Sequence, residues 1–390
     1  MSEQAKMHGI DGTLVDADWP ALCLNDVRAV LSAYGEVAAD VAIESVSPRP
    51  FSAASVVRAG QERVFIKRHH RSVRTAEGLE EEHAFMAHLR ASGLAVPRVR
   101  TALDGYSAVE AGEWTYEVHD LPEGVDLYRD AISWTPFTSA EHAHSAGAML
   151  ARMHLAAEGY AAPARRVQPL VASFSIFAAH DAEAALRAYF NARPALAESA
   201  ETWRHAQAGF ELLKPFHRAL LPLLPALKPL WTHNDLHASN LFWSDESARA
   251  QAVAVIDFGL ADRTNAVHDL AQAIERNIVE WLWLVQHLDR PQEIPVHVDH
   301  LAALLDGYES ERPLSAEEAA ALAPMTALCH AEFALTEADY FLGPLHSEEK
   351  ARVASDSYLV GHARWFRSSA GLQLLDALHR WTDVHQGAAR

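Results

Sequence analysis

The fold is decided by two short polar stretches, WTHNDLHASN at residues 231–240 and VIDFG at residues 255–259. Between them, apolar residues at 241–243 and 252–256 flank a polar turn. Two short apolar runs around a polar turn are typical of a β-hairpin. We therefore expect a hairpin here, with polar residues at the open end of both strands.

The open end of this hairpin should gather oxygen-bearing side chains. Because hairpin strands are antiparallel, the residue before the first strand and the residue after the second lie at the same end. Asn240 and Asp257 are therefore expected to be neighbours, with Asp235 just upstream. An Asp carboxylate and an Asn carbonyl suit Mg²⁺ held jointly with substrate phosphates. A second carboxylate could orient and deprotonate an attacking hydroxyl.

The same stretch also permits a different kind of site. His233, Asp235 and His237 form a His-x-Asp-x-His pattern, which is a plausible ligand set for Zn²⁺ or Fe²⁺. That interpretation predicts a metal-dependent hydrolase. It leaves Asn240 and Asp257 without a role.

Upstream, the first third of the chain is rich in predicted strands. One helix interrupts them, with Thr75 as its N-cap and Gly93 as its stop. Glu82 falls on the apolar face of this helix, where an unpaired carboxylate is costly. It either has a partner or lies at a partly exposed edge of that face, beside Glu80 and Glu81. β-Branched and aromatic residues separated by turn residues predict strands at 53–58, 63–67, 106–110 and 114–121.

The rest of the chain is mostly helical in pattern, apart from the hairpin. The sequence therefore predicts an α+β fold, with a boundary near residues 120–125. Helical periodicity occurs at 140–157, 181–192, 202–221, 266–288, 298–308, 316–339 and 347–380.

Composition narrows the class of protein. The 390 residues are 49% hydrophobic and 22% charged, which excludes wholesale disorder. The formal net charge of −19 argues against a general nucleic-acid binder or a polybasic membrane anchor. The chain has only five lysines, and one of them, Lys67, ends a predicted strand.

Compartment can also be predicted from the sequence. Two cysteines, Cys23 and Cys329, cannot build a disulfide framework. The polar, acidic first 20 residues lack the pattern of a signal peptide, and no apolar run reaches the ~18 residues of a membrane span. We expect a cytoplasmic protein with no membrane or nucleic-acid partner.

The two stretches together carry a family resemblance. His-x-Asp-x-x-x-x-Asn followed by Ile-Asp-Phe-Gly resembles the aminoglycoside phosphotransferase and choline kinase superfamily, which are small-molecule kinases with a protein-kinase-like fold. The resemblance implies a bilobal α+β fold, with a small antiparallel-sheet N-lobe and a larger helical C-lobe. On this basis we predict an N-terminal tail at 1–20, a nucleotide-binding N-lobe at 21–121 and a C-lobe at 122–390.

The resemblance assigns roles around the hairpin. It implies that Asp235 is the catalytic aspartate, that Asn240 and Asp257 are Mg²⁺ ligands, and that His233 and Asp269 brace the catalytic loop. Asn234 stands where the family commonly has glycine or arginine.

The resemblance also assigns the nucleotide side. It implies that Lys67 grips ATP phosphates and that Glu82 is its ion-pair partner, with Glu81 as the alternative. Residues 116–121 would form the hinge that meets adenine, which makes Glu117 and His119 candidates for nucleotide contact. The loop before the lysine strand, residues 50–55, has no glycine, and its phosphate-binding candidates are Ser52 and Ser55.

The acceptor should bind in the helical part. Acidic and aromatic residues there suit a cationic, amine-bearing acceptor, whereas Arg263 suits a carboxylate. Candidates for acceptor contact are His237, Asp262, Arg263, Glu275, Glu280, Trp281 and Trp283.

The sequence thus predicts an ATP- and Mg²⁺-dependent kinase. Its acceptor would be a hydroxyl of an amino alcohol, amino acid, sugar or aminoglycoside-like molecule. The metal hydrolase and a catalytically silent nucleotide-binding scaffold remain as alternatives. A monomer and a homodimer are both compatible with the sequence.

Overall fold

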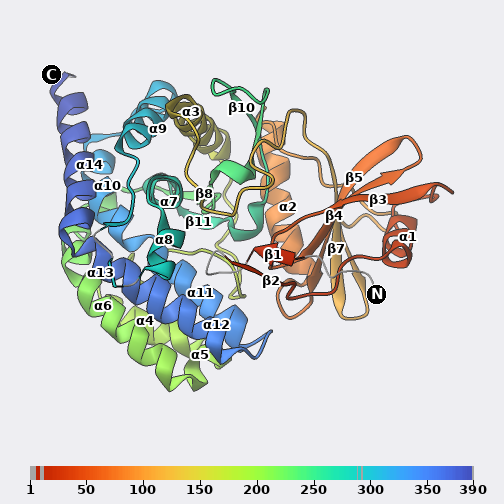
Figure 1. Ribbon diagram of the computed structural model, residues 1–390, viewed down its shortest axis with the longest axis horizontal. Coiled ribbons are helices and arrows are strands. Elements are labelled where there is room, and N and C mark those ends of the chain that lie inside the picture. Colours follow the sequence, from red (N-terminus) through yellow and green to blue (C-terminus); the bar gives the residue numbers. More distant parts are fainter. Residues whose placement is uncertain (1–5, 9–12, 288, 291–292, 389–390) are drawn as a thin grey trace.

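The N-terminal part of the chain forms one antiparallel five-stranded sheet, at the right of Figure 1. The computed structural model describes residues 6–8, 13–287, 289–290 and 293–388. The strands lie in the order β3-β4-β5-β7-β6. Their bounds are β3 (Val41–Val46), β4 (Ala53–Ala59), β5 (Glu62–His70), β6 (Ala108–Ala111) and β7 (Trp114–Asp120).

The central strand β5 sets the position of the lysine. It pairs with β4 on one side and with β7 on the other, and this register places Lys67 directly across from Glu117. Helices α1 (Leu24–Ser32) and α2 (Ala76–Ala91) accompany the sheet. The predicted N-cap of α2 is confirmed, because the Thr75 hydroxyl accepts a hydrogen bond from the Gly78 backbone N–H at 3.1 Å.

The C-terminal part is built mainly of helices (Figure 1). Among the residues that the structure describes, no helix is long and apolar enough to cross a membrane. The helices are α3 (Ala140–Ala157), α4 (Ala182–Asn191), α5 (Pro194–Glu198), α6 (Ala200–Leu220), α7 (Ala266–Ile278), α8 (Trp281–Gln286), α9 (Val298–Glu311), α10 (Ala316–Leu328), α11 (His330–Leu342), α12 (Glu348–Arg352), α13 (His362–Phe366) and α14 (Ser369–Ala388).

Two short strand pairs flank the polar stretches at residues 231–240 and 255–259. The predicted hairpin is confirmed, with β9 (Leu241–Trp243) antiparallel to β10 (Ala252–Val255). A second pair joins β8 (Pro229–Thr232) to β11 (Asp262–Asn265), which the sequence did not predict. The first pair carries Asn240 and Asp257 at its open end, and the second delivers the chain into the catalytic loop.

Helices α3 and α9 pack with their backbones in contact. A Cβ atom on Gly147 would lie 1.9 Å from the Leu304 carbonyl oxygen, and one on Gly307 would lie 1.9 Å from the His144 carbonyl oxygen. Only glycine permits this approach. The close packing brings Tyr308 of α9 onto His154 of α3, a contact that matters for the catalytic loop.

Three stretches predicted as long helices are interrupted. The pattern at 316–339 is divided at Cys329 into α10 and α11. The pattern at 266–288 is split because Val279 is extended (φ −112°), so α7 ends at Ile278. The pattern at 347–380 contains a π-helix, η5 (Val353–Gly361), between α12 and α13. The π-helix is rare and is often found at functional sites.

The segment predicted as an N-terminal tail makes specific contacts. Strand β1 (Lys6–His8) pairs with β2 (Leu14–Asp16), while residues 1–5 and 9–12 of the predicted tail lie outside the described residues. Asp18 accepts from the Lys350 ammonium at 2.5 Å, and the Trp19 indole N–H donates to the Tyr340 hydroxyl at 2.9 Å. The partners lie more than 300 residues away in sequence, so no local pattern could indicate them.

Candidate active site

Two adjoining clefts lie where the strand pairs meet the sheet. The larger has a volume of about 350 Å³ and the smaller about 150 Å³. Both are lined by Lys67, Asn240 and Asp257. Asp235 and His237 line the larger cleft, whereas Glu117 and residues 119–122 line the smaller one. The predicted catalytic and metal-binding residues are therefore gathered at the junction of the clefts.

The catalytic loop is fixed from below by Asp269. Its buried carboxylate accepts the backbone N–H groups of His233 at 2.9 Å and Asn234 at 2.7 Å. It also contacts His154 Nε2 at 3.0 Å, and His154 Nδ1 meets the Tyr308 hydroxyl at 2.7 Å. Burial alone would raise the pKa of Asp269, but these contacts lower it below its ordinary value. Asp269 is therefore an anionic anchor for the loop.

Asn234 adopts a backbone conformation that few residues tolerate. Its φ is 60°, in the left-handed region favoured by glycine and asparagine. Its side-chain oxygen accepts from the hydroxyls of Thr232 at 2.9 Å and Thr264 at 3.2 Å. The unusual asparagine in the motif thus meets both a backbone and a hydrogen-bonding requirement.

Asp235 sits between two donors. Arg276 Nη1 lies 3.2 Å from Oδ1, and the Asn240 amide donates to Oδ2 at 3.3 Å and to the Asp235 backbone carbonyl at 2.9 Å. Burial raises the pKa of Asp235 to about 6, while Arg276 acts in the opposite direction. A carboxylate with this pKa is a better proton acceptor than an ordinary aspartate. The sequence analysis did not identify Arg276, which lies 41 residues downstream.

Asp257 forms an ion pair with Lys67. The Lys67 ammonium donates to Asp257 Oδ1 at 2.8 Å. Burial alone would raise the pKa of Asp257, but Lys67 lowers it below its ordinary value. Burial alone would lower the pKa of Lys67, yet Asp257, Glu117 and Glu82 raise it above its ordinary value. Both groups are therefore charged near neutral pH.

Lys67 and Glu82 do not form the expected ion pair. Glu82 is buried on α2, but it contacts Arg165 Nη2 at 3.3 Å, while Lys67 is held by Asp257. The alternative candidate Glu81 also lies toward Arg165, at 3.6 Å. The physical reason is that Arg165, a fully buried guanidinium, reaches α2 from the loop after α3 and needs carboxylate partners itself.

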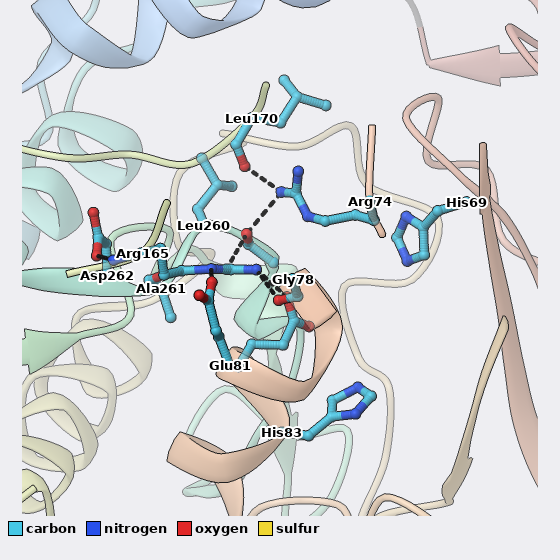
Figure 2. Close-up of polar contacts among 12 residues, drawn as sticks. His69, Arg74, Gly78, Glu81, His83, Arg165, Leu170, Leu260, Ala261 and Asp262 are labelled. Atoms are coloured by element: carbon cyan, nitrogen blue, oxygen red, sulfur yellow. Dashed lines mark hydrogen bonds and ion pairs between the residues drawn. The ribbon is translucent and has the colours of Figure 1, made fainter. Parts of the chain in front are cut away.

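Figure 2 shows Arg165 lying between α2 and the segment after Asp257. It donates to the backbone carbonyls of Gly78 at 2.6 Å, Gly259 at 3.1 Å and Ala261 at 3.2 Å. Arg74 donates to the same Gly259 carbonyl at 2.9 Å and also to Leu170. Two arginines thus fasten the helix of the N-lobe to the segment that carries Asp257.

Glu117 is occupied by histidines. Its buried carboxylate contacts His69 Nε2 at 3.0 Å, His83 Nε2 at 2.7 Å and His119 Nε2 at 2.8 Å. Burial alone would raise the pKa of Glu117, but the imidazoles hold it well below its ordinary value. His119 also lines the smaller cleft, at the position predicted for the hinge.

The two serines of the glycine-free loop, residues 50–55, lie in different environments. Ser52 lines the larger cleft, whereas Ser55 is buried within β4 and is not among the described residues that line either cleft. Arg49 lines both clefts and donates to the Ser133 hydroxyl at 2.9 Å. The sequence analysis missed this cation, which lies at the junction of the two clefts.

Of the predicted acceptor contacts, His237 lines the larger cleft. The other candidates do not line either cleft in the described part of the chain. Asp262 accepts two backbone N–H groups at 2.7 Å, Arg263 is exposed, Glu275 is buried beside His330 and His362, and Glu280 contacts His297 at 2.8 Å. Trp281 stacks on His362 and Trp283 on His287.

The larger cleft has a different apolar and acidic wall. It is lined by Trp134, Phe333, Tyr358 and Glu337. Glu337 is buried, its Oε2 has no hydrogen-bond partner among the described residues, and burial raises its pKa to about 8. Glu337 is one of three acidic residues on α11, with Glu332 and Asp339, so no local pattern singled it out for this site.

The predicted hydrolase site is not assembled. His233 Nε2 meets the Ile256 carbonyl at 2.9 Å, and His233 Nδ1 accepts the Asp235 backbone N–H at 3.2 Å. His237 Nδ1 meets the Ser239 hydroxyl at 2.9 Å. Within the described residues, His233, Asp235 and His237 do not bring ligand atoms to one point. Of the three, His233 braces the loop, whereas Asp235 and His237 line the larger cleft.

The fold and site define a phosphotransferase with a protein-kinase-like fold, as the motifs predicted. The chain belongs to the phosphotransferase enzyme family, whose profile matches residues 49–314, more than half of the sequence. The predicted membership and the predicted bilobal α+β fold are both confirmed. No curated protein matches the sequence.

Solved structures share this fold at low identity. The microcompartment-associated aminopropanol kinase has 21% identity and a TM-score of 0.57, over 90% of this chain and 99% of that chain. An aminoglycoside phosphotransferase from Alicyclobacillus acidocaldarius has 16% identity and a TM-score of 0.51, over 94% and 97%. The amicoumacin kinase hAmiN, in complex with AMP-PNP, Ca²⁺ and Ami, has 13% identity and a TM-score of 0.54, over 87% and 95%.

Proposed function

We propose that the protein transfers the γ-phosphate of ATP to a hydroxyl group of a small, amine-bearing molecule. The observation that carries this proposal is the gathering of Lys67, Asp235, Asn240 and Asp257 at the junction of two clefts. One cleft would hold the nucleotide and the other the acceptor. The kinases of similar fold, one of them in complex with AMP-PNP and Ca²⁺, support nucleotide use.

The smaller cleft suits the nucleotide. It lies against β7 and residues 119–122, where backbone groups can meet adenine. Lys67 and Arg49 supply positive charge at its inner end, toward the acceptor. Positive charge fixed beside the phosphates stabilises the charge that develops during transfer.

The donor set fits a magnesium ion. The Asn240 amide nitrogen donates to Asp235, which leaves the side-chain oxygen of Asn240 for a metal. Asp257 is held deprotonated by Lys67. Oxygen donors of this kind suit Mg²⁺ shared with phosphates. When bound there, the ion would offset the charge of the transferring phosphate.

Asp235 would receive the proton. The acceptor oxygen attacks the γ-phosphorus, the bond from the γ-phosphorus to the bridging oxygen of ADP breaks, and the hydroxyl proton passes to the Asp235 carboxylate. Arg276 and Asn240 hold that carboxylate in place. Catalysis then consists mainly of positioning and charge stabilisation.

The wall of the larger cleft supports an amine on the acceptor. Glu337 offers a buried carboxyl oxygen without a partner among the described residues, and Trp134, Phe333 and Tyr358 surround the space. A carboxylate and aromatic faces attract an ammonium group. Amino alcohols and aminoglycosides therefore lead the list of acceptors to test.

The test is ADP release that depends on Mg²⁺, ATP and acceptor. The acceptor panel holds amino alcohols, aminoglycosides, hydroxyl-bearing amino acids and neutral sugars. We expect stimulation by an amine-bearing acceptor, and a loss of roughly 10²- to 10⁴-fold in Asp235→Asn, the range for removal of a general base. Asp245→Asn, an exposed aspartate in the hairpin turn, is the matched control and should keep full activity.

Two results would contradict the proposal. Full transfer by Asp235→Asn would remove the assigned base. An absence of saturable ATP binding would remove the nucleotide and favour the silent scaffold.

A further inference from the structure

A second cluster of histidine and carboxylate lies deep in the C-lobe, outside both clefts. It comprises Glu275 of α7, His330 at the start of α11 and His362 at the start of α13. The exposed fractions of their whole residues are 0%, 2% and 2%. Three chain segments far apart in sequence therefore bring three ligand-type side chains to one buried point.

The contacts within this cluster are not hydrogen bonds. His330 Nδ1 and His362 Nδ1 each lie 3.3 Å from the same oxygen, Glu275 Oε1. Typical N–H···O bonds are about 2.9 Å long. A separation of about 3.3 Å is instead the edge of a tetrahedron whose centre lies 2.0–2.1 Å from each corner, the bond lengths of zinc to imidazole and carboxylate ligands.

None of the polar atoms in the cluster is satisfied. Both carboxylate oxygens of Glu275 and both ring nitrogens of His330 and His362 lack a hydrogen-bond partner among the described residues. Buried polar groups without partners are rare and costly, and a buried unpaired carboxylate is costlier still. The nearest cation in sequence, Arg276, is directed to Asp235.

The backbone around the cluster is arranged to present the ligands. His362 follows directly on the π-helix η5, whose extra residue per turn changes the direction of the side chains after it. Trp281 stacks on the His362 ring at 3.6 Å, and the His330 and His362 rings lie 4.1 Å apart. These contacts fix the orientation of the rings while leaving the Nδ1 atoms turned to Glu275.

We propose that Glu275, His330 and His362 bind a zinc ion that joins α7, α11 and α13. Two imidazoles and one carboxylate suit zinc better than magnesium, which prefers oxygen ligands in octahedral geometry. The ion offsets the charge of Glu275 and supplies a partner for the three atoms that face one another. It also fastens the helix whose next residue, Arg276, holds Asp235.

The test is the zinc content of tag-free protein, purified in the presence of a chelator to remove loosely held metal. We expect about one zinc ion per chain in the wild type and loss of that ion in His330→Gln and His362→Gln. His83→Gln, from the Glu117 cluster, is the matched control and should keep its zinc. Anomalous scattering from a crystal should place the ion between the three side chains.

A refolding experiment guards against variants that do not fold. Wild-type protein is denatured, freed of metal and refolded with Zn²⁺ or with Mg²⁺. We expect a higher melting temperature with Zn²⁺ only. Zinc below a tenth of an equivalent after refolding with Zn²⁺, or zinc retained by both histidine variants, would overturn the proposal. These readouts do not depend on transferase activity.

Discussion

The two histidine–glutamate clusters use the same residue types in different ways. In the N-lobe, Glu117 accepts three imidazoles at 2.7–3.0 Å, and its carboxylate is fully engaged. In the C-lobe, Glu275 meets two imidazoles at 3.3 Å, and both of its oxygens lack hydrogen bonds within the described residues. Three members of the first cluster, His83, Glu117 and His119, also have the spacing of metal ligands, but their polar atoms already hydrogen-bond to one another. The comparison teaches that the presence or absence of hydrogen bonds, not residue type, distinguishes this cluster from the one for which we propose a metal ion.

The two clusters also help to determine which carboxylates Lys67 and Arg276 contact. Because histidines engage Glu117, its cross-strand neighbour Lys67 turns to Asp257. Because Glu275 turns to His330 and His362, Arg276 is left for Asp235. Each cluster therefore engages a carboxylate next to a catalytic-site cation: Glu117 lies across from Lys67 in the sheet, and Glu275 precedes Arg276 in the sequence.

The largest effect should come from removing the carboxylate of the first cluster. Glu117→Gln leaves three imidazoles, two of them buried, without their anion, and we expect the free energy of unfolding to fall by about 3 kcal/mol. Urea unfolding at neutral pH measures this loss, with exposed Glu246→Gln as the control. The comparison predicts the same loss with Zn²⁺ and with a chelator; a loss that requires zinc would break it.

The Glu117 cluster also predicts a pH dependence. The folded-state pKa of Glu117 lies below its ordinary value, so its contribution to stability is present above that ordinary value. The contribution is lost as pH falls through the folded-state pKa. In Glu117→Gln this part of the acid destabilisation should be absent.

A third buried carboxylate, Glu337, sharpens the comparison. Among the described residues it contacts no histidine and belongs to no group with the spacing of metal ligands. We expect Glu337→Gln to raise KM for an amine-bearing acceptor roughly tenfold, the cost of losing a hydrogen bond to a charged group. KM for an acceptor without an amine should not change. Since the pKa of Glu337 is about 8, KM for the amine should improve as pH rises toward that value. Equal effects on both acceptors would contradict this role.

The smallest effect concerns Arg276, which joins the second cluster to the catalytic loop. In the proposed mechanism deprotonated Asp235 is the active form, so transfer should decline as pH falls below about 6. Arg276 favours the deprotonated form, and Arg276→Met should move this decline upward by about one pH unit. The pH profile of kcat/KM measures the shift. An unchanged profile would mean that Arg276 does not act on Asp235.

The parts of the site that are local in sequence could be predicted. The hairpin follows from two short apolar runs around a polar turn, and its antiparallel geometry alone brings Asn240 near Asp257. The N-cap Thr75 and the helix at 140–157 were readable because capping and periodicity are properties of neighbouring residues. The role of Lys67 stays a prediction, but its place beside Asp257 agrees with the motifs.

The parts that depend on distant partners could not be predicted. Glu82 was expected to pair with Lys67, but its partner is Arg165, which lies 83 residues away in the sequence. Glu275 looked like a candidate for acceptor contact, but its position on α7 points it at histidines from two later helices. A sequence shows that a buried carboxylate needs a partner, and only the packing shows which one it finds.

The conformation of Asn234 restricts which amino acids the loop can accept. A φ of 60° admits glycine, asparagine and aspartate at low cost. Glycine would remove the Asn234 side-chain oxygen, which contacts the hydroxyls of Thr232 and Thr264 and also His268 Nδ1. The two hydroxyls would then keep only each other and the backbone carbonyls of Asp262 and Asn265. We therefore expect Thr232, Asn234, Thr264 and His268 to evolve together.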